Sequence, residues 1–83
     1  MRIDQLTEGA EVVLGFTESH GMHRESATFV GRSGEGEDRL ATFSTPPAHA
    51  TFGQSYEWEA YRHRGRWCYG TSAQTLRLLE VQS

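Results

Sequence analysis

The sequence of 83 residues has no lysine, one cysteine, two prolines and no long hydrophobic run. The single cysteine, Cys68, excludes an internal disulfide and favours a reducing compartment, so we expect a cytoplasmic protein. No apolar stretch approaches the roughly 20 residues that a membrane-spanning helix needs. No apolar segment follows Met1, so no cleaved secretion signal and no membrane partner are expected. All eight basic residues are arginine, which is typical of a high-G+C prokaryotic genome.

The length bounds the organisation of the chain. Eighty-three residues make one small domain, residues 1–83, with little length to spare for a self-sufficient core. Hydrophobic residues are 36% of the chain and charged residues 23%, which is a polar composition. Nine aromatic residues are nevertheless available to build a core, so a folded domain is expected and extensive disorder is not.

The charges are distributed unevenly along the chain. The net charge is −3. Residues 1–40 contain four arginines and eight acidic residues, whereas residues 41–83 contain four arginines and three acidic residues. Three of the latter arginines lie within residues 62–66, as a basic tip on an acidic body. This balance disfavours non-specific binding to duplex nucleic acid, which needs several phosphate contacts.

Six short segments have the composition of β-strands and are separated by turn signals at intervals of roughly 8–12 residues. We expect strands at residues 11–16, 26–32, 39–45, 55–63, 66–69 and 75–81. The polar residues 17–25 are expected to form a loop, and Pro46-Pro47 ends the third strand. The last segment has a helical alternative, because Leu and Glu favour helices. The regular spacing of short strands favours a small barrel or sandwich.

Residues 55–69 predict a hairpin with a tight turn at Arg64-Gly65, where glycine supplies a positive φ. Alternation along the two strands then separates an apolar face from a polar one. We expect the apolar face to cover the core, with Arg62 lying on Trp67 at its rim. The alternative is that part of this face is an exposed platform for a base or a methylated side chain.

The core of the whole domain draws on apolar positions of most of the predicted strands. It is expected to comprise Val12, Leu14, Phe29, Phe43, Trp58, Ala60, Trp67, Leu76 and Leu79.

No strong catalytic or metal-binding motif is present. His20-Gly21-Met22-His23 places two histidines at a spacing that would suit zinc, but paired cysteines are lacking. The pair is either a weak metal-binding or pH-responsive site at His20 and His23, or two exposed loop histidines. Cys68 and the acidic residues of the 55–63 strand form no catalytic constellation. We therefore expect a protein that is not an enzyme and needs no cofactor.

Two segments of the chain resemble a known architecture. Leu6-Thr7-Glu8-Gly9-Ala10-Glu11-Val12-Val13-Leu14 resembles the entry to SH3-like small barrels of the KOW or Tudor type, where a glycine turn precedes an apolar strand. The tail from Trp67 to Leu79 resembles their ending. The resemblance implies an all-β fold, a strongly bent antiparallel barrel of five to six strands with one short 3₁₀ turn before the last strand. Such barrels serve many binding roles.

The first functional hypothesis is a non-catalytic binding or adaptor module for a protein partner. Loops and strand edges are the usual contact surfaces of small barrels, and Arg and Tyr concentrate binding energy. The alternative is a module for single-stranded nucleic acid such as RNA, with arginines on phosphate and an aromatic ring on a base. A homodimer through a strand edge is a further possibility. The candidate binding residues are Arg62, Arg64, Arg66, Tyr61, Phe52 and His49.

Overall fold

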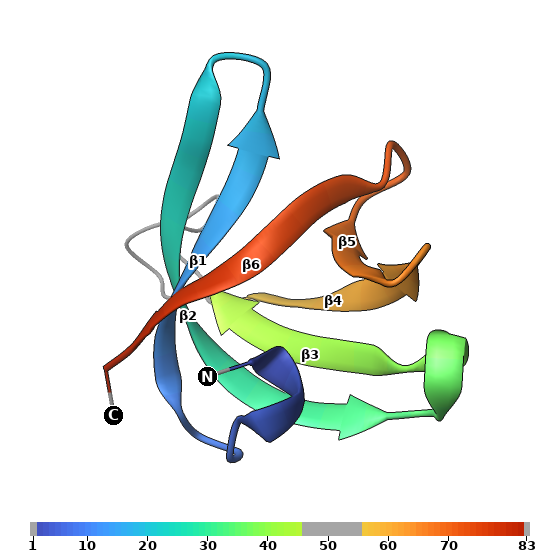
Figure 1. Ribbon diagram of the computed structural model, residues 1–83. Helices are drawn as coiled ribbons and strands as arrows, with labels where there is room; N and C mark the ends of the chain where they lie inside the picture. Colours follow the sequence, from blue (N-terminus) through green and yellow to red (C-terminus); the bar gives the residue numbers. More distant parts are fainter. Residues whose placement is uncertain (1, 46–55, 83) are drawn as a thin grey trace.

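Six antiparallel strands close into a barrel in the order of the sequence, with β1 hydrogen-bonded to both β2 and β6 (Figure 1). The structure is a computed structural model and describes residues 2–45 and 56–82. The expected all-β antiparallel barrel is confirmed, and its layout agrees with the SH3-like resemblance. The elements are the 3₁₀ turns η1 (Ile3–Gln5) and η2 (Gly36–Asp38) and the strands β1 (Glu11–Glu18), β2 (Gly21–Ser33), β3 (Leu40–Thr45), β4 (Tyr56–His63), β5 (Arg66–Tyr69) and β6 (Gln74–Val81).

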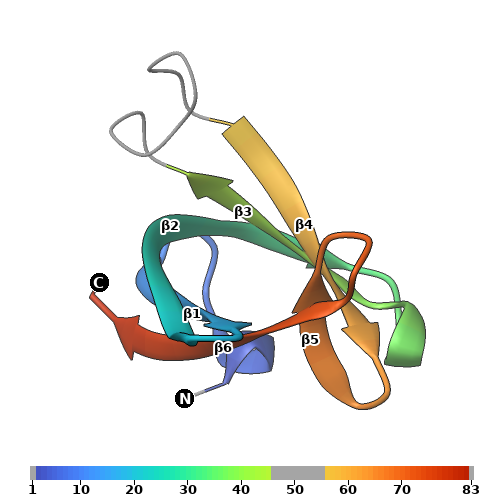
Figure 2. The ribbon, with the colours of Figure 1, turned by 90° about the horizontal axis from the view of Figure 1, so that it is seen from above.

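The end of the chain forms a strand, as expected, and not the alternative helix. A short 3₁₀-type turn leads into it, since the Ala73 N–H donates to the Gly70 carbonyl at 3.2 Å. β6 then runs antiparallel to β1 and closes the barrel. In the view from above, β6 runs beside β1 and turns back into β5, so it links the two strands (Figure 2).

The prediction of a loop at residues 17–25 is wrong, because this stretch forms the end of a β-hairpin. β1 and β2 pair as far as Glu18 and Gly21, which leaves only Ser19 and His20 for the turn. The hairpin projects beyond the rest of the barrel (Figure 1), and residues 17–24 are all exposed. A strand with solvent on both faces has no apolar alternation, so its sequence resembles that of a loop.

Two irregularities in the register bend the strands around the barrel. In β2 the pairing with β3 shifts between Phe29 and Gly31, and in β6 the pairing with β1 shifts opposite Val13 and Leu14. An extra residue on one strand increases its bend and local twist. The expected core is wrong at Leu79: Leu78 lies on the same face of β6 as Leu76 and packs on the core, whereas Leu79 is the extra residue at the register shift and is not part of the core cluster.

The core fills the barrel and is closed at one end by η1. Ile3 and Leu6 are buried there, beside the rings of Phe29 and Phe43, which lie edge to face at 5.6 Å between centroids. Trp58 is partly buried and packs against the core. The remaining expected core residues, Leu79 excepted, belong to the buried cluster: Val12, Leu14, Ala60, Trp67 and Leu76.

Arg32 attaches η1 to the barrel, and its removal is expected to loosen this end. Its Nη1 donates to the carbonyls of Ile3 and Leu6 at 3.2 and 2.8 Å, and its guanidinium lies 5.2 Å from the centroid of the Phe29 ring. Arg32→Met keeps an unbranched stem but leaves both part-buried carbonyls without this donor. We expect a loss of about 1–3 kcal/mol in the free energy of unfolding, measured in urea.

The control for this prediction is Arg24→Met. Arg24 forms an ion pair with Glu80 at 3.3 Å in which both side chains are more than half exposed. Such a surface pair contributes less than about 1 kcal/mol. Equal losses from the two substitutions would show that the two carbonyl contacts of Arg32 do not stabilise the barrel.

Candidate functional site

The β4–β5 hairpin has the predicted register and turn. Arg62 pairs with Trp67 and His63 pairs with Arg66, and the turn residues Arg64 and Gly65 have φ values of +53° and +76°. Two successive positive φ values match the twist of the flanking strands. The hairpin therefore directs Arg62 and Trp67 to its inner face and places Arg64 at the tip.

A groove opens in the barrel wall where β5 and β6 separate. These strands pair only at Cys68–Thr75 and Tyr69–Gln74. Arg66 and Trp67, at the start of β5, are therefore not paired with the later residues of β6. The groove lies between this divergence and η1 and has a volume of about 770 Å³. We call it the arginine groove; it is lined by arginines together with Asp4, Trp67 and residues 75–78 of β6.

The arginine groove is basic although the protein has a net charge of −3. Five of the eight arginines of the chain line it. Among the described residues, Asp4 is the only acidic residue in the lining. Its Oδ1 lies 3.2 Å from Nη1 of Arg39. The groove thus gathers positive charge from four separate parts of the chain: Arg2, Arg39, Arg62, Arg66 and Arg77.

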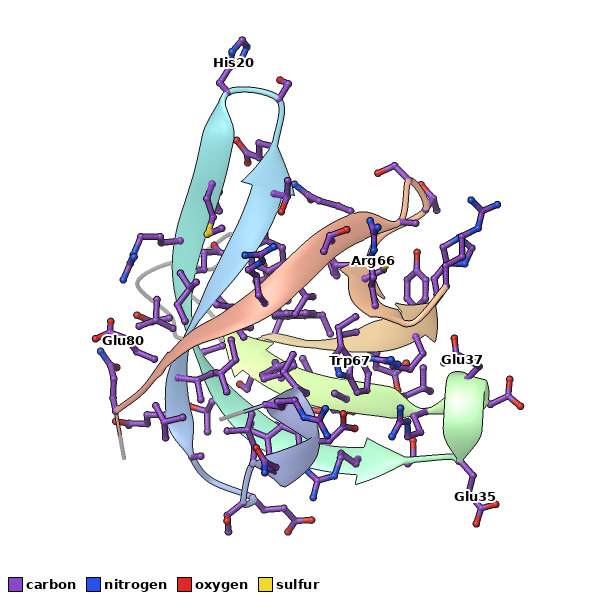
Figure 3. The ribbon with its side chains drawn as sticks, viewed as in Figure 1. His20, Glu35, Glu37, Arg66, Trp67 and Glu80 are labelled. Atoms are coloured by element: carbon purple, nitrogen blue, oxygen red, sulfur yellow. The ribbon has the colours of Figure 1, made fainter. Side chains whose placement is uncertain are left out.

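Trp67 lies in the wall of the groove, and Figure 3 shows its position inward of β5. Its side chain is almost fully buried, and the guanidinium carbons of Arg62 and Arg39 lie 5.3 and 6.0 Å from the ring centroid. Arginines over an indole ring are held by cation–π attraction. The expected contact of Arg62 with Trp67 is confirmed.

Two buried donors in this wall have no acceptor among the described residues. They are Nε1 of Trp67 and Nε of Arg62, whose nearest carboxylate oxygen, Oε1 of Glu37, is 3.8 Å away. An unsatisfied buried donor costs about 1–3 kcal/mol.

The structure brings together only some of the predicted binding residues. Arg62 and Arg66 line the groove, whereas Arg64 does not. Tyr61 is also outside it, and its hydroxyl donates to the carbonyl of Gly70. His49 and Phe52 lie outside the described residues.

Sequence reasoning missed three groove arginines, Arg2, Arg39 and Arg77. They come from the N-terminal segment, the link between η2 and β3, and β6, and each stands alone in its segment. No local pattern marks them. Only the barrel closure, which sets β6 and η1 beside the β4–β5 hairpin, brings them to one groove.

The two histidines proposed for a metal do not converge with further ligands. His20 occupies the turn at the far end of the β1–β2 hairpin (Figure 3), and Nε2 of His23 lies 3.7 Å from Oε1 of Glu25. Within residues 2–45 and 56–82, no three His, Cys, Asp or Glu side chains are placed to hold one ion. The described geometry therefore gives the metal hypothesis no support.

No protein-family model, curated protein or solved structure matches this chain. In the part of the chain that the structure describes, no helix has the length and apolar character needed to cross a membrane.

Proposed function

We propose that this protein is a non-catalytic binding module whose arginine groove holds an acidic segment of another protein. The observation that carries the proposal is a groove lined by five arginines in a protein of net charge −3, with two of these arginines held over the ring of Trp67. Arginine presents several N–H donors in a planar fork that matches the two oxygens of a carboxylate. A chain of Glu or Asp side chains supplies both the negative charge and the acceptors.

The shape of the groove suits an extended segment. β6 pairs with β5 only at Gln74 and Thr75. The next residues of β6 line the groove, so the edge of β6 that faces β5 borders it there. An extended peptide can lie along such an edge and add main-chain hydrogen bonds to its side-chain contacts. Arg77 lies on this part of β6 and is exposed, which places a cation beside the proposed path of the peptide.

An acidic peptide fits the groove better than a nucleic-acid strand does. Non-specific binding of single strands relies on aromatic rings on which successive bases stack. Trp67 is only 7% exposed and carries two guanidinium groups near its ring. Of the two rings predicted to stack a base, Tyr61 lies outside the groove with its hydroxyl bonded to Gly70, and Phe52 lies outside the described residues. Among the described residues, the groove therefore offers charge without an exposed ring for stacking.

The proposal of a binding role without catalysis agrees with the position of the one cysteine. Cys68 is 2% exposed and its thiol lies 3.9 Å from the carbonyl of Arg66, so a substrate cannot reach it. A buried cysteine of this kind behaves as a small apolar residue. We also propose the cytosol as the location of the protein, where a free thiol stays reduced.

The test is a titration with a hexaglutamate peptide, followed by NMR through the two indole N–H signals. Binding is expected to shift the signal of Trp67 and to leave that of Trp58 unchanged, because only Trp67 lines the groove. Arg66→Gln is expected to weaken binding about threefold to tenfold, since it removes a charged donor. Added salt is expected to weaken binding further by screening.

Arg64→Gln is the matched control, because Arg64 belongs to the same hairpin but does not line the groove. We expect it to change the affinity less than twofold. Equal losses from Arg64→Gln and Arg66→Gln would assign the binding to the hairpin tip and contradict the groove. Tighter and more salt-sensitive binding of a uridine hexamer would favour the RNA alternative instead.

A further inference from the structure

A second concavity, with no lining residue in common with the arginine groove, lies between β1, β2, β4, β5 and β6. Its volume is about 150 Å³. We call it the aromatic pocket, because four of its eight lining residues are aromatic: Phe16, Tyr56, Trp58 and Tyr69. A cavity of roughly this volume in another protein holds a molecule the size of benzene. The aromatic pocket therefore has room for one head group and not for a whole peptide.

Three of the rings form a connected cluster of tilted and edge-on contacts. The centroid of Tyr69 lies 4.9 Å from that of Trp58 and 5.8 Å from that of Phe16, with interplanar angles of 72° and 71°. Trp58 and Phe16 complete the cluster at 5.8 Å and 52°. A ring face attracts a cation within about 6 Å of its centroid, so walls built from these rings favour a positively charged ligand.

The Trp58 ring is fixed in place before any ligand arrives. Its Nε1 donates to Oγ1 of buried Thr45 at 2.8 Å, and it stacks on Phe43 at 5.1 Å between centroids. Gln74 is also held, because its Nε2 donates to the carbonyl of Thr17 at 2.9 Å. A site whose walls are already ordered loses less entropy when a ligand binds.

The charges around the aromatic pocket are the reverse of those in the groove. Glu18 and Glu25 line it, and no arginine does so among the described residues. Glu25 faces His23 at 3.7 Å, beyond hydrogen-bond distance. Glu18 pairs with Gly21 through its backbone, and its carboxylate has no ion pair or hydrogen bond with any other described residue. Two carboxylates with acceptor capacity to spare thus stand beside the aromatic walls.

We propose that the aromatic pocket binds the guanidinium group of an arginine side chain on a partner protein. A guanidinium stacks on aromatic faces and at the same time donates to carboxylates in a planar fork. A quaternary ammonium has no N–H to donate and would leave Glu18 and Glu25 without hydrogen bonds. The small volume admits the head group alone, so the rest of the ligand stays outside, as it does for a side chain on a larger chain.

The test is an NMR titration with the blocked peptide acetyl-Gly-Arg-Gly-amide. We expect a dissociation constant on the order of 1 mM, because one head group makes few contacts. The indole N–H signal of Trp58 should shift and that of Trp67 should stay, so the result is independent of the arginine groove. Glu18→Gln is expected to weaken binding roughly tenfold by removing a charged acceptor.

Two matched comparisons make the proposal falsifiable. Citrulline in place of arginine has the same planar shape without the charge, and we expect it to cause no shift of Trp58. Glu57→Gln removes an exposed charge of β4 outside the pocket, and we expect less than a twofold change. The proposal is overturned by equal binding of the citrulline peptide, by tighter binding of tetramethylammonium, or by equal effects of Glu57→Gln and Glu18→Gln.

Discussion

Replacing Phe43 by alanine is expected to lower the free energy of unfolding by about 3–5 kcal/mol. Phe43 is completely buried and its ring contacts those of Phe29 and Trp58, at 5.6 and 5.1 Å between centroids. The substitution removes apolar burial and leaves a cavity between two rings that are held from other sides. For a chain of 83 residues, whose total stability is about 4–12 kcal/mol, this loss is close to the threshold of unfolding.

The measurement is urea denaturation followed by far-UV circular dichroism. Phe43→Leu is the companion variant, because it keeps most of the apolar volume and is expected to lose less than about 1.5 kcal/mol. It also keeps the experiment informative if Phe43→Ala does not fold. A loss below about 1 kcal/mol for Phe43→Ala would contradict a core centred on this ring.

Gly34→Ala is expected to destabilise the protein by at least about 2 kcal/mol. Gly34 follows β2 with φ of +78°, and a Cβ added there would lie 2.4 Å from the carbonyl oxygen of Asp38. Both the positive φ and the overlap with backbone oppose any side chain. The turn must then shift, and with it Glu37, whose Oε2 accepts from the Gly65 N–H at 3.4 Å.

Gly36→Ala provides the comparison within the same turn. Gly36 also has a positive φ, +57°, but an added Cβ would meet nothing within 4 Å. We expect a loss of about 1 kcal/mol from the backbone conformation alone. Thermal unfolding of the two variants measures the difference, and equal losses would show that the overlap with Asp38 relaxes without cost.

The two proposed sites have opposite chemistry and separate positions on one small barrel. The arginine groove gathers five cations beside Trp67, and the aromatic pocket sets two carboxylates beside Trp58. With both sites occupied, the module would hold an acidic segment and an arginine side chain at once. Each tryptophan reports one site, so the two proposals succeed or fail separately.

Strand composition predicted most of the barrel but missed the projecting hairpin. β3, β4 and β5 begin and end within one residue of the predicted ranges, because each has buried positions that leave an apolar pattern. Residues 17–24 are exposed, so this part of the hairpin carries no such pattern. Leu79 is a different error: alternation from Leu76 points to Leu78 as the next residue on the core face, and the expected core named Leu79, the extra residue at the register shift, in its place.

The sequence by itself determined the all-β class, the Arg64-Gly65 turn and the pairing of Arg62 with Trp67, since these depend on residues that are neighbours along the chain or across one hairpin. The tertiary structure decided where both sites lie. The groove needs Arg2, Arg39 and Arg77 beside the hairpin, and the aromatic pocket needs Phe16 beside Trp58 and Tyr69. Closure of β6 onto β1 creates these contacts, and no local sequence pattern records how distant strands meet around a barrel.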